Sequence, residues 1–349
     1  MEMMKTLVVN GDGSLEVKEI PIPAISSRQA LVKTISCGIC NGTDAKLIHR
    51  TFKGVGPDQY PLMLGHEGVG EVVAVGDEVT TYQIGDKVLL PFVDPDEERF
   101  GKLGSAWGAY SEYAVVHDAA AYGDGKCPEC AYAQTILPEY VDAVDAAMIV
   151  TLREVLSSMK RFGMNANDSA AVFGCGPVGL TFIRLMSLMG MHPIIAFDIK
   201  DEKKEEAIRM GADYAFNSTE KDPREVIRTI CPDGVKFVLD AVGMLSLINP
   251  AMEMIADGGK ICCYGIAPEC EMKLDWSKAP YNWQLHFQQF PSKAEEAEAT
   301  NQILAWIRTG VINLKDYISD YIQFEDILEA FEMLEKKAIS KKGIIVYSA

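Results

Sequence analysis

The sequence lacks both a long apolar run and an excess of positive charge. A membrane-spanning helix needs about 20 consecutive apolar residues, so we expect no such helix in this chain. The opening residues, MEMMKTLVVN, also lack the apolar core of a secretory signal. These absences predict a soluble protein of the cytoplasm.

The shortage of positive charge excludes one class of partner. The 33 Lys and Arg residues are outnumbered by 50 Asp and Glu residues, which gives a net charge of −17. Nucleic-acid binding requires a basic surface, so it is not expected here.

Nine cysteines in 349 residues are also too few for a disulfide scaffold. We expect free thiols or metal ligands instead.

The hydrophobic pattern changes along the chain. Residues 1–120 contain short Val-, Ile- and Tyr-rich runs separated by Gly-Asp turn signals, which predicts a compact β-rich domain. From about residue 140 the apolar spacing becomes helical, and this helix is expected to end at Gly163. Strand and helix patterns then alternate, which is typical of a doubly wound parallel sheet. The fold class predicted is therefore α/β.

A glycine-rich turn follows the predicted strand AAVF and opens a predicted helix. It reads GCGPVG. Gly174 would permit the tight turn, Gly176 would let the backbone approach a pyrophosphate, and Gly179 would allow close helix packing. Pro177 and Val178 lie at the start of the helix, whose free N–H groups attract a phosphate. The pattern predicts a dinucleotide-binding loop.

A carboxylate lies where such a loop needs one. Asp198 ends the next predicted strand, HPIIAFD. It would accept hydrogen bonds from the adenosine ribose hydroxyls and repel a 2′-phosphate, so NAD is favoured over NADP. Lys203 follows, and it would either contact the ribose or remain solvated at a helix start.

Metal-binding side chains occur in the first part of the chain. Residues 65–79 read GHEGVGEVVAVGDEV, in which His66 and Glu67 are adjacent. Cys40 precedes them in CGICNGTD. Thiolate, imidazole and carboxylate are ligands that suit zinc.

Together these motifs resemble the zinc-containing medium-chain alcohol and polyol dehydrogenases, in the branch that includes sorbitol and threonine dehydrogenases. The resemblance covers essentially the full chain. It implies a GroES-like catalytic domain over residues 1–147, rejoined by about 291–349. It also implies a Rossmann NAD-binding domain over residues 148–290.

The resemblance also implies roles for individual residues. Cys40 and His66 match the ligands of a catalytic zinc. Thr43 matches the hydroxyl that links the substrate to a proton relay, and Asp44 matches the carboxylate that orients a ligand. Lys46 takes the place where some relatives carry a relay histidine.

The chain departs from the pattern of its relatives in two places near these residues. Relatives have one residue between the Cys and the Ser or Thr, whereas here there are two, Asn41 and Gly42. We expect a wider glycine turn to absorb the extra residue. Val150 occupies the place of the third zinc ligand. Glu67 and Glu154 together are expected to replace it, the latter because it lies one helical turn further along.

A second zinc site is not expected. Relatives with a structural zinc carry four closely spaced cysteines after the GDKV-type strand. The corresponding stretch here, DPDEERFGKLGSAWGAYSEY, contains none. A Cys-x-x-Cys pair, Cys127 and Cys130, occurs later, and it is either a surface loop with idle thiols or a metal or redox site.

Two further loops match the nicotinamide side of the cofactor site in relatives. Val242 lies in DAVG, and Gly265 and Ile266 lie in CYGI. Ordinary loops that contain glycine and do not contact a cofactor would have the same sequence.

The function expected is zinc-dependent hydride transfer between a secondary alcohol, with a polyol or sugar alcohol as the expected class, and NAD. The partner would be a small-molecule substrate, and the protein would form a homo-oligomer, a dimer or tetramer. One alternative is a zinc-free, NADPH-dependent enone or quinone reductase of the same superfamily. The other is a non-catalytic NAD-sensing protein.

Overall fold

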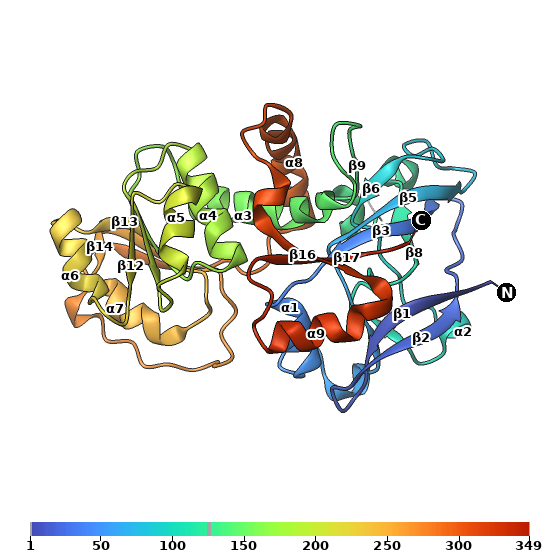
Figure 1. Cartoon of the computed structure of the whole chain (residues 1–349), viewed down its shortest axis with the longest axis horizontal. Helices are drawn as coiled ribbons and strands as arrows, with labels where there is room; N and C mark the ends of the chain where they lie inside the picture. The colour runs from blue at the N-terminus through green and yellow to red at the C-terminus, as the bar shows by residue number, and fades with distance from the viewer. Residues whose placement is uncertain (1, 124–126, 349) are drawn as a thin grey trace. The chain divides into compact units, whose positions relative to one another are not determined.

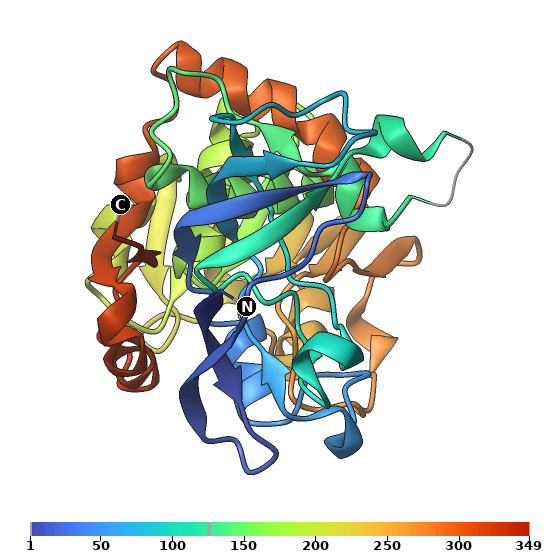
Figure 2. The ribbon, with the colours of Figure 1, turned by 90° about the vertical axis from the view of Figure 1, so that its right-hand side faces the viewer.

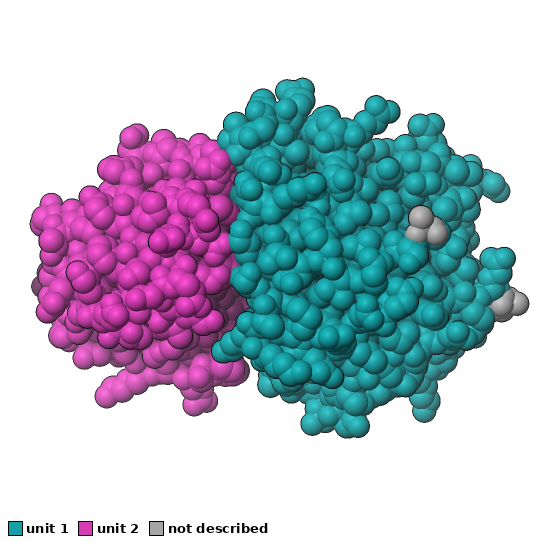
Figure 3. Space-filling model, in the orientation of Figure 1, with its two compact units in different colours: residues 1–153, 292–349 teal, residues 154–291 magenta. Residues whose placement is uncertain are grey.

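The computed structural model describes residues 2–123 and 127–348. The chain divides into two compact units, which are residues 1–153 with 292–349 (unit 1) and residues 154–291 (unit 2), coloured separately in Figure 3. The boundary lies within helix α3 (Met148–Phe162). The domain limits expected from the sequence remain predictions.

Unit 1 is built on two sheets. The larger sheet has the order β16-β17-β3-β5-β6-β9, with β8 also pairing with β3, and the smaller sheet has the order β2-β1-β4-β7. Figures 1 and 2 show β1 and β2 side by side as an antiparallel pair. The larger sheet comprises β3 (Gln29–Gly38), β5 (Gly68–Val75), β6 (Lys87–Leu89), β8 (Tyr113–His117), β9 (Thr135–Ile136), β16 (Ile318–Gln323) and β17 (Lys342–Val346). The smaller sheet comprises β1 (Met3–Val9), β2 (Leu15–Pro21), β4 (Leu62–Met63) and β7 (Gly104–Ser105).

The central strand β3 explains the β-rich pattern of the sequence. Its residues alternate between half-buried and buried until the last three, which are all buried. This is the period expected of a strand with one face on a core. The helices that accompany the sheets are α1 (Thr43–Ile48), α2 (Glu97–Phe100), α8 (Lys293–Arg308) and α9 (Ile327–Glu335).

Unit 2 contains a six-stranded, all-parallel sheet. Its order is β12-β11-β10-β13-β14-β15, which is the order of a dinucleotide-binding Rossmann fold. Its strands are β10 (Ala170–Phe173), β11 (Ile194–Asp198), β12 (Tyr214–Asn217), β13 (Val235–Asp240), β14 (Ile255–Cys263) and β15 (Trp283–Phe287). Its helices are α4 (Pro177–Leu188), α5 (Lys203–Met210), α6 (Pro223–Ile230) and α7 (Ile248–Met252).

The central strand β10 of unit 2 is apolar throughout, as expected when helices cover both faces of a parallel sheet. All four residues of β10 are buried. The predicted α/β fold, a β-rich domain with a doubly wound parallel sheet, is confirmed. No helix among the described residues has the length and apolar character that crossing a membrane requires.

The predicted end of the helix at Gly163 is also confirmed. Helix α3 ends at Phe162, and Gly163 follows in the left-handed conformation (φ 78°). The acidic run KAEEAEA opens α8, where Ser292 and Glu295 form a capping box.

Candidate functional site

Three potential metal ligands converge in unit 1. Cys40 follows β3, and His66 and Glu67 immediately precede β5. One donor atom from each lies within 4.8 Å of the others. His66 and Glu67 are buried, and Cys40 is half-buried. A thiol, an imidazole and a carboxylate gathered below the surface form a donor set that fits zinc.

Asp44 holds the loop that carries Cys40. Its Oδ2 accepts hydrogen bonds from the Cys40 backbone N–H (3.0 Å) and the Tyr110 hydroxyl (2.7 Å). Its Oδ1 lies 3.6 Å from Nδ1 of His66. Burial raises the pKa of this fully buried carboxyl, and the His66 imidazole opposes the rise. Asp44 thus faces one nitrogen of His66 and leaves Nε2 for a metal.

Two buried atoms of this group have no hydrogen-bond partner among the described residues. They are Oδ1 of Asp44 and Nδ1 of His66, which face one another beyond hydrogen-bond distance. Buried polar atoms without partners are uncommon in proteins. A small approach of the imidazole toward Asp44 would pair them, and binding of a metal at Nε2 would favour it. The residues present therefore fit a zinc ion.

Glu67 makes a buried ion pair that the sequence did not reveal. Nζ of Lys342, the first residue of β17, lies 2.8 Å and 2.7 Å from its two carboxylate oxygens. The Thr151 hydroxyl donates to Oε1 at 3.4 Å. A Cβ added to Gly38 would overlap Oε2 of Glu67. The glycine at position 38 therefore leaves room for the carboxylate beside Lys342. A carboxylate has about four lone-pair sites, so Glu67 can accept these bonds and still bind a metal.

The expected third-ligand position is apolar in the structure. Val150 lies in the first turn of α3 and is fully buried. Glu154 lies one turn later and belongs to unit 2. The structure does not bring Glu154 into the ligand group, and its role as a ligand stays a prediction.

The extra residue after Cys40 is absorbed differently from expectation. Gly42 has φ −66° and ψ −54°, an ordinary right-handed helical conformation. The Asp44 N–H donates to the Cys40 carbonyl at 2.9 Å, which closes a helical turn leading into α1. A wider glycine turn is therefore wrong. Thr43 is buried at the start of α1, and Lys46 is half-buried on the same helix.

The glycine-rich loop of unit 2 has the geometry that its sequence predicts. Gly174 has φ 95°, which a residue with a side chain rarely adopts. A Cβ on Gly179 would overlap the Gly174 carbonyl oxygen, whereas a Cβ on Gly176 would meet no atom within 4 Å. Pro177 and Val178 begin α4 behind Gly176, its N-cap residue. The open space at Gly176 is where a pyrophosphate would approach the backbone.

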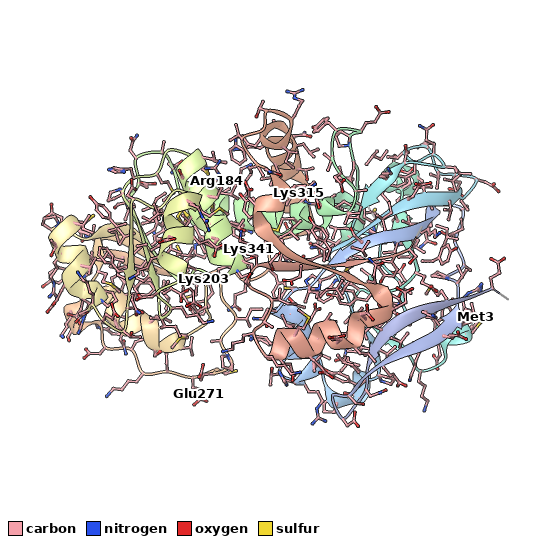
Figure 4. All side chains as sticks on the ribbon, viewed as in Figure 1. Met3, Arg184, Lys203, Glu271, Lys315 and Lys341 are labelled. Atoms are coloured by element: carbon pink, nitrogen blue, oxygen red, sulfur yellow. The ribbon has the colours of Figure 1, made fainter. Side chains whose placement is uncertain are left out.

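Asp198 is tied to this loop by its own hydrogen bonds. Its Oδ2 accepts from the Cys175 N–H at 2.7 Å, and its Oδ1 accepts from the Lys200 N–H at 2.9 Å. Lys203, labelled in Figure 4, begins α5, and its ammonium pairs with Glu206 at 2.9 Å. The two backbone N–H groups thereby fix the Asp198 carboxylate at the end of β11.

The remaining candidate cofactor loops meet each other. Asp240, at the end of β13, accepts hydrogen bonds from the N–H groups of Val242 (2.9 Å) and Gly243 (2.8 Å). A Cβ on Gly265 would overlap the Gly243 nitrogen, so the two loops are packed backbone to backbone. Ile266 follows Gly265, and Val242 is half exposed. Close packing is thus one structural reason for these glycines.

Cys127 and Cys130 are not part of any group of potential metal ligands among the described residues. Both are half-buried free thiols. Burial raises the pKa of Cys130 to about 11 and also raises that of Cys127. A protonated thiol is a poor nucleophile, which disfavours redox chemistry at this pair.

Comparison with known proteins gives consistent matches. A model described as "Alcohol dehydrogenase GroES-like domain" matches residues 26–131, and one described as "Zinc-binding dehydrogenase" matches residues 177–305. An L-threonine 3-dehydrogenase from Symbiobacterium thermophilum is 30% identical over 278 residues, which is 74% of each chain. A sorbitol dehydrogenase from Bacillus subtilis is 24% identical, covering 94% of this chain and 93% of its own.

A solved structure shares the fold over almost the whole chain. It is a short chain alcohol dehydrogenase (rspB) from E. coli CFT073, complexed with the cofactor NADH. The TM-score is 0.80 at 22% identity, covering 99% of this chain and 100% of the other.

Proposed function

The chain belongs to the zinc-binding medium-chain dehydrogenase family and is an oxidoreductase, and from this premise we propose that it transfers a hydride between a secondary alcohol and NAD. The observation that carries the proposal is the convergence of Cys40, His66 and Glu67. A thiolate, an imidazole and a carboxylate could together hold one catalytic zinc.

Zinc, when bound, supplies a Lewis acid that lowers the pKa of an alcohol hydroxyl. Cys40 and His66 would hold the ion, and Asp44 would fix the orientation of the His66 ring. Glu67 and Glu154 are the candidates for the remaining protein ligand. Lys342 offsets the negative charge of Glu67, so Glu67 adds less charge to the site than an unpaired carboxylate would.

The substrate proton needs a path away from the site. We assign the Thr43 hydroxyl to take up the proton of the alcohol hydroxyl as it gives up its own, and Lys46, in its neutral amine form, to receive that proton and release it to solvent. The two residues lie on the same short helix, three positions apart, where side chains share a face. This spacing and the resemblance to the family support the assignment.

NAD, when bound, supplies the hydride acceptor. Gly174, Gly176 and Gly179 would form the pyrophosphate loop with Pro177 and Val178, and Asp198 would bind the ribose hydroxyls. Two backbone N–H groups hold the Asp198 carboxylate in place. This supports the proposal that its negative charge would repel a 2′-phosphate. Lys203 is assigned to the adenosine end, and the nicotinamide side is assigned to Val242, Gly265 and Ile266.

The substrate class proposed is a polyol or sugar alcohol. Relatives named as sorbitol dehydrogenases and L-threonine 3-dehydrogenases support it, because both names denote secondary alcohols with further polar groups. A zinc-free reductase using NADPH is disfavoured by the intact ligand group and by Asp198. A non-catalytic NAD-sensing protein is favoured only by Val150, which cannot bind a metal.

We also propose a homo-oligomer, a dimer or tetramer, located in the cytoplasm. The cysteines that the structure describes are free, which is the usual state in a reducing compartment.

Metal analysis of the purified protein and steady-state assays with a panel of alcohols test the proposal. The panel contains sorbitol, 2,3-butanediol, threonine and 2-propanol, each with NAD and with NADP. We expect bound zinc and NAD-dependent oxidation of at least one panel member. Zinc-free protein that reduces enones with NADPH would instead support the zinc-free reductase, and NAD binding without turnover of any alcohol would support the sensor.

A further inference from the structure

One loop of unit 1 lies beside the segment that leads to His66. The Ala106 N–H donates to the Met63 carbonyl at 2.8 Å, and the Ala109 N–H donates to the Gly65 carbonyl at 2.9 Å. Trp107 lies between these two attachment points. The loop is therefore fixed next to the candidate metal ligand group.

The backbone of Trp107 is strained. Its φ is 69°, and Gly108 follows with the same φ of 69°. Two consecutive residues with positive φ are normally Asn, Asp or Gly, and a bulky residue there is an outlier. The Val93 N–H donates to the Trp107 carbonyl at 2.8 Å, which helps to hold this conformation. Such strain is concentrated at active sites and ligand clamps.

The strained residue presents its ring to the site. The Trp107 indole centroid lies 5.2 Å from that of the His66 imidazole, with the planes at 51°. The Phe52 ring lies 6.3 Å away and meets the indole edge to face, at 82°. Both aromatic residues are half-buried. The indole thus forms an apolar surface directly beside a candidate zinc ligand.

We propose that Trp107 determines substrate specificity by packing against the carbon chain of the alcohol beyond the reacting carbon. The inference rests on the proposed function and deepens it, because it assigns the substrate to the class of extended secondary alcohols. Binding strength increases with the apolar area that is buried. A methyl group covers little of an indole, whereas the C–H face of a longer chain covers much more.

An indole suits a hydroxylated chain as well as a hydrocarbon. Trp combines a large apolar face with an N–H donor. The C–H groups of a polyol can pack on the ring face while its hydroxyls point to water or to polar groups. Trp107 is half-buried, so part of the residue remains accessible to a substrate.

The experiment compares wild type with Trp107→Asn, Trp107→Gly and Trp107→Phe, all as zinc-containing full-length enzyme. Asn and Gly tolerate positive φ, so they remove the indole without adding strain. Phe keeps an aromatic face and is the conservative control. For each enzyme, kcat and KM are measured with NAD for 2-propanol and for the extended alcohol that wild type oxidises best.

We expect kcat/KM for the extended alcohol, relative to 2-propanol, to fall about tenfold or more in the Asn and Gly variants. The change should lie mainly in KM, because the lost contact forms in both the ground and transition states. Phe should retain most of the preference. Zinc content and thermal midpoints at or above those of wild type would show that the fold is kept.

An unchanged preference in both variants, or a wild type without any preference for extended alcohols, would overturn the inference while leaving the proposed function in place. A fall in preference accompanied by equal loss of zinc and of thermal stability would assign Trp107 a structural role and would also overturn it. If wild type oxidised no alcohol at all, the proposed function itself would fail.

Discussion

Asp198 has two tasks at the scale of a single residue. It provides negative charge at the end of β11, and it accepts hydrogen bonds from the backbone of Cys175 and of Lys200. Replacement by alanine would remove both functions together and could disturb the glycine-rich loop. Replacement by asparagine keeps an acceptor oxygen and removes the charge, so it isolates the electrostatic contribution.

We predict that Asp198→Asn lowers the preference for NAD over NADP about tenfold, which corresponds to about 1.4 kcal/mol. The physical reason is loss of repulsion toward the 2′-phosphate. The measurement is the ratio of kcat/KM values for the two cofactors. Asp201→Asn removes an exposed carboxylate three residues later and serves as the control. A variant ratio equal to that of wild type would show that this carboxylate does not select the cofactor.

The ion pair of Glu67 and Lys342 shows how one buried residue can affect the stability of the fold. The side chains of both are almost fully buried, with exposed fractions of 1% and 4%. Two buried opposite charges can be nearly neutral for stability when both are present. Removal of one partner leaves the other charge buried without compensation, and this is the costly state.

We predict that Lys342→Met lowers the free energy of unfolding by about 3–5 kcal/mol. Urea denaturation of the metal-free protein measures it, so that zinc binding does not contribute. Lys336→Met breaks an exposed ion pair with Glu332 and should cost no more than about 0.5 kcal/mol. Adding Glu67→Gln to Lys342→Met should restore most of the loss. No recovery in the double variant would mean that Lys342 stabilises the fold through other contacts.

At the scale of the element, helix α3 carries the position where the third zinc ligand is expected. Its third residue is Val150, and Glu154 follows one turn later. A zinc ion with only a thiolate and an imidazole would retain open positions and excess positive charge, which favours a nearby carboxylate. The helix therefore offers Glu154 as one candidate, and Glu67, the residue before β5, is the other.

We predict that Glu154→Gln or Glu67→Gln weakens zinc retention about tenfold or more. Zinc loss is followed by metal analysis after dialysis against increasing chelator. Glu205→Gln, which alters an exposed carboxylate on α5, is the control and should hold zinc as wild type does. Because Glu67→Gln leaves Lys342 unpaired, its result is read together with Glu67→Gln/Lys342→Met. Wild-type retention in both single variants would assign the ligand position to another group.

The distance along the chain between contacting elements also explains which parts of the structure could be predicted from the sequence. The glycine-rich loop, α4 and the acid at the end of β11 lie close together in the chain, so their pattern predicted the geometry. Lys342 pairs with Glu67 across 275 residues, and no local pattern encodes such a contact. The positive φ of Trp107 could not be predicted either. Turns with two positive φ values favour Asn-Gly or Asp-Gly, and the sequence Trp-Gly does not indicate such a turn.

At the scale of the whole molecule, the two units divide the chemistry between them. Unit 1 contains Cys40, His66 and Glu67, and unit 2 contains the glycine-rich loop and Asp198. Metal content reports on the ligand group of unit 1 and on the candidate ligand Glu154, whereas cofactor binding reports on the glycine-rich loop and Asp198 of unit 2. The number of zinc ions per chain is the simplest such measurement.

We predict about one zinc per chain, since the sequence provides one set of thiolate, imidazole and carboxylate ligands and no four-cysteine cluster between residues 94 and 113. Elemental analysis of the purified protein gives the ratio. Cys40→Ala should reduce it to near zero and abolish alcohol oxidation, because the remaining imidazole and carboxylate lack the thiolate that selects zinc. Cys127→Ser/Cys130→Ser should leave the ratio unchanged. A value near two in wild type that falls to one in this double variant would reveal a second zinc site at the Cys-x-x-Cys pair.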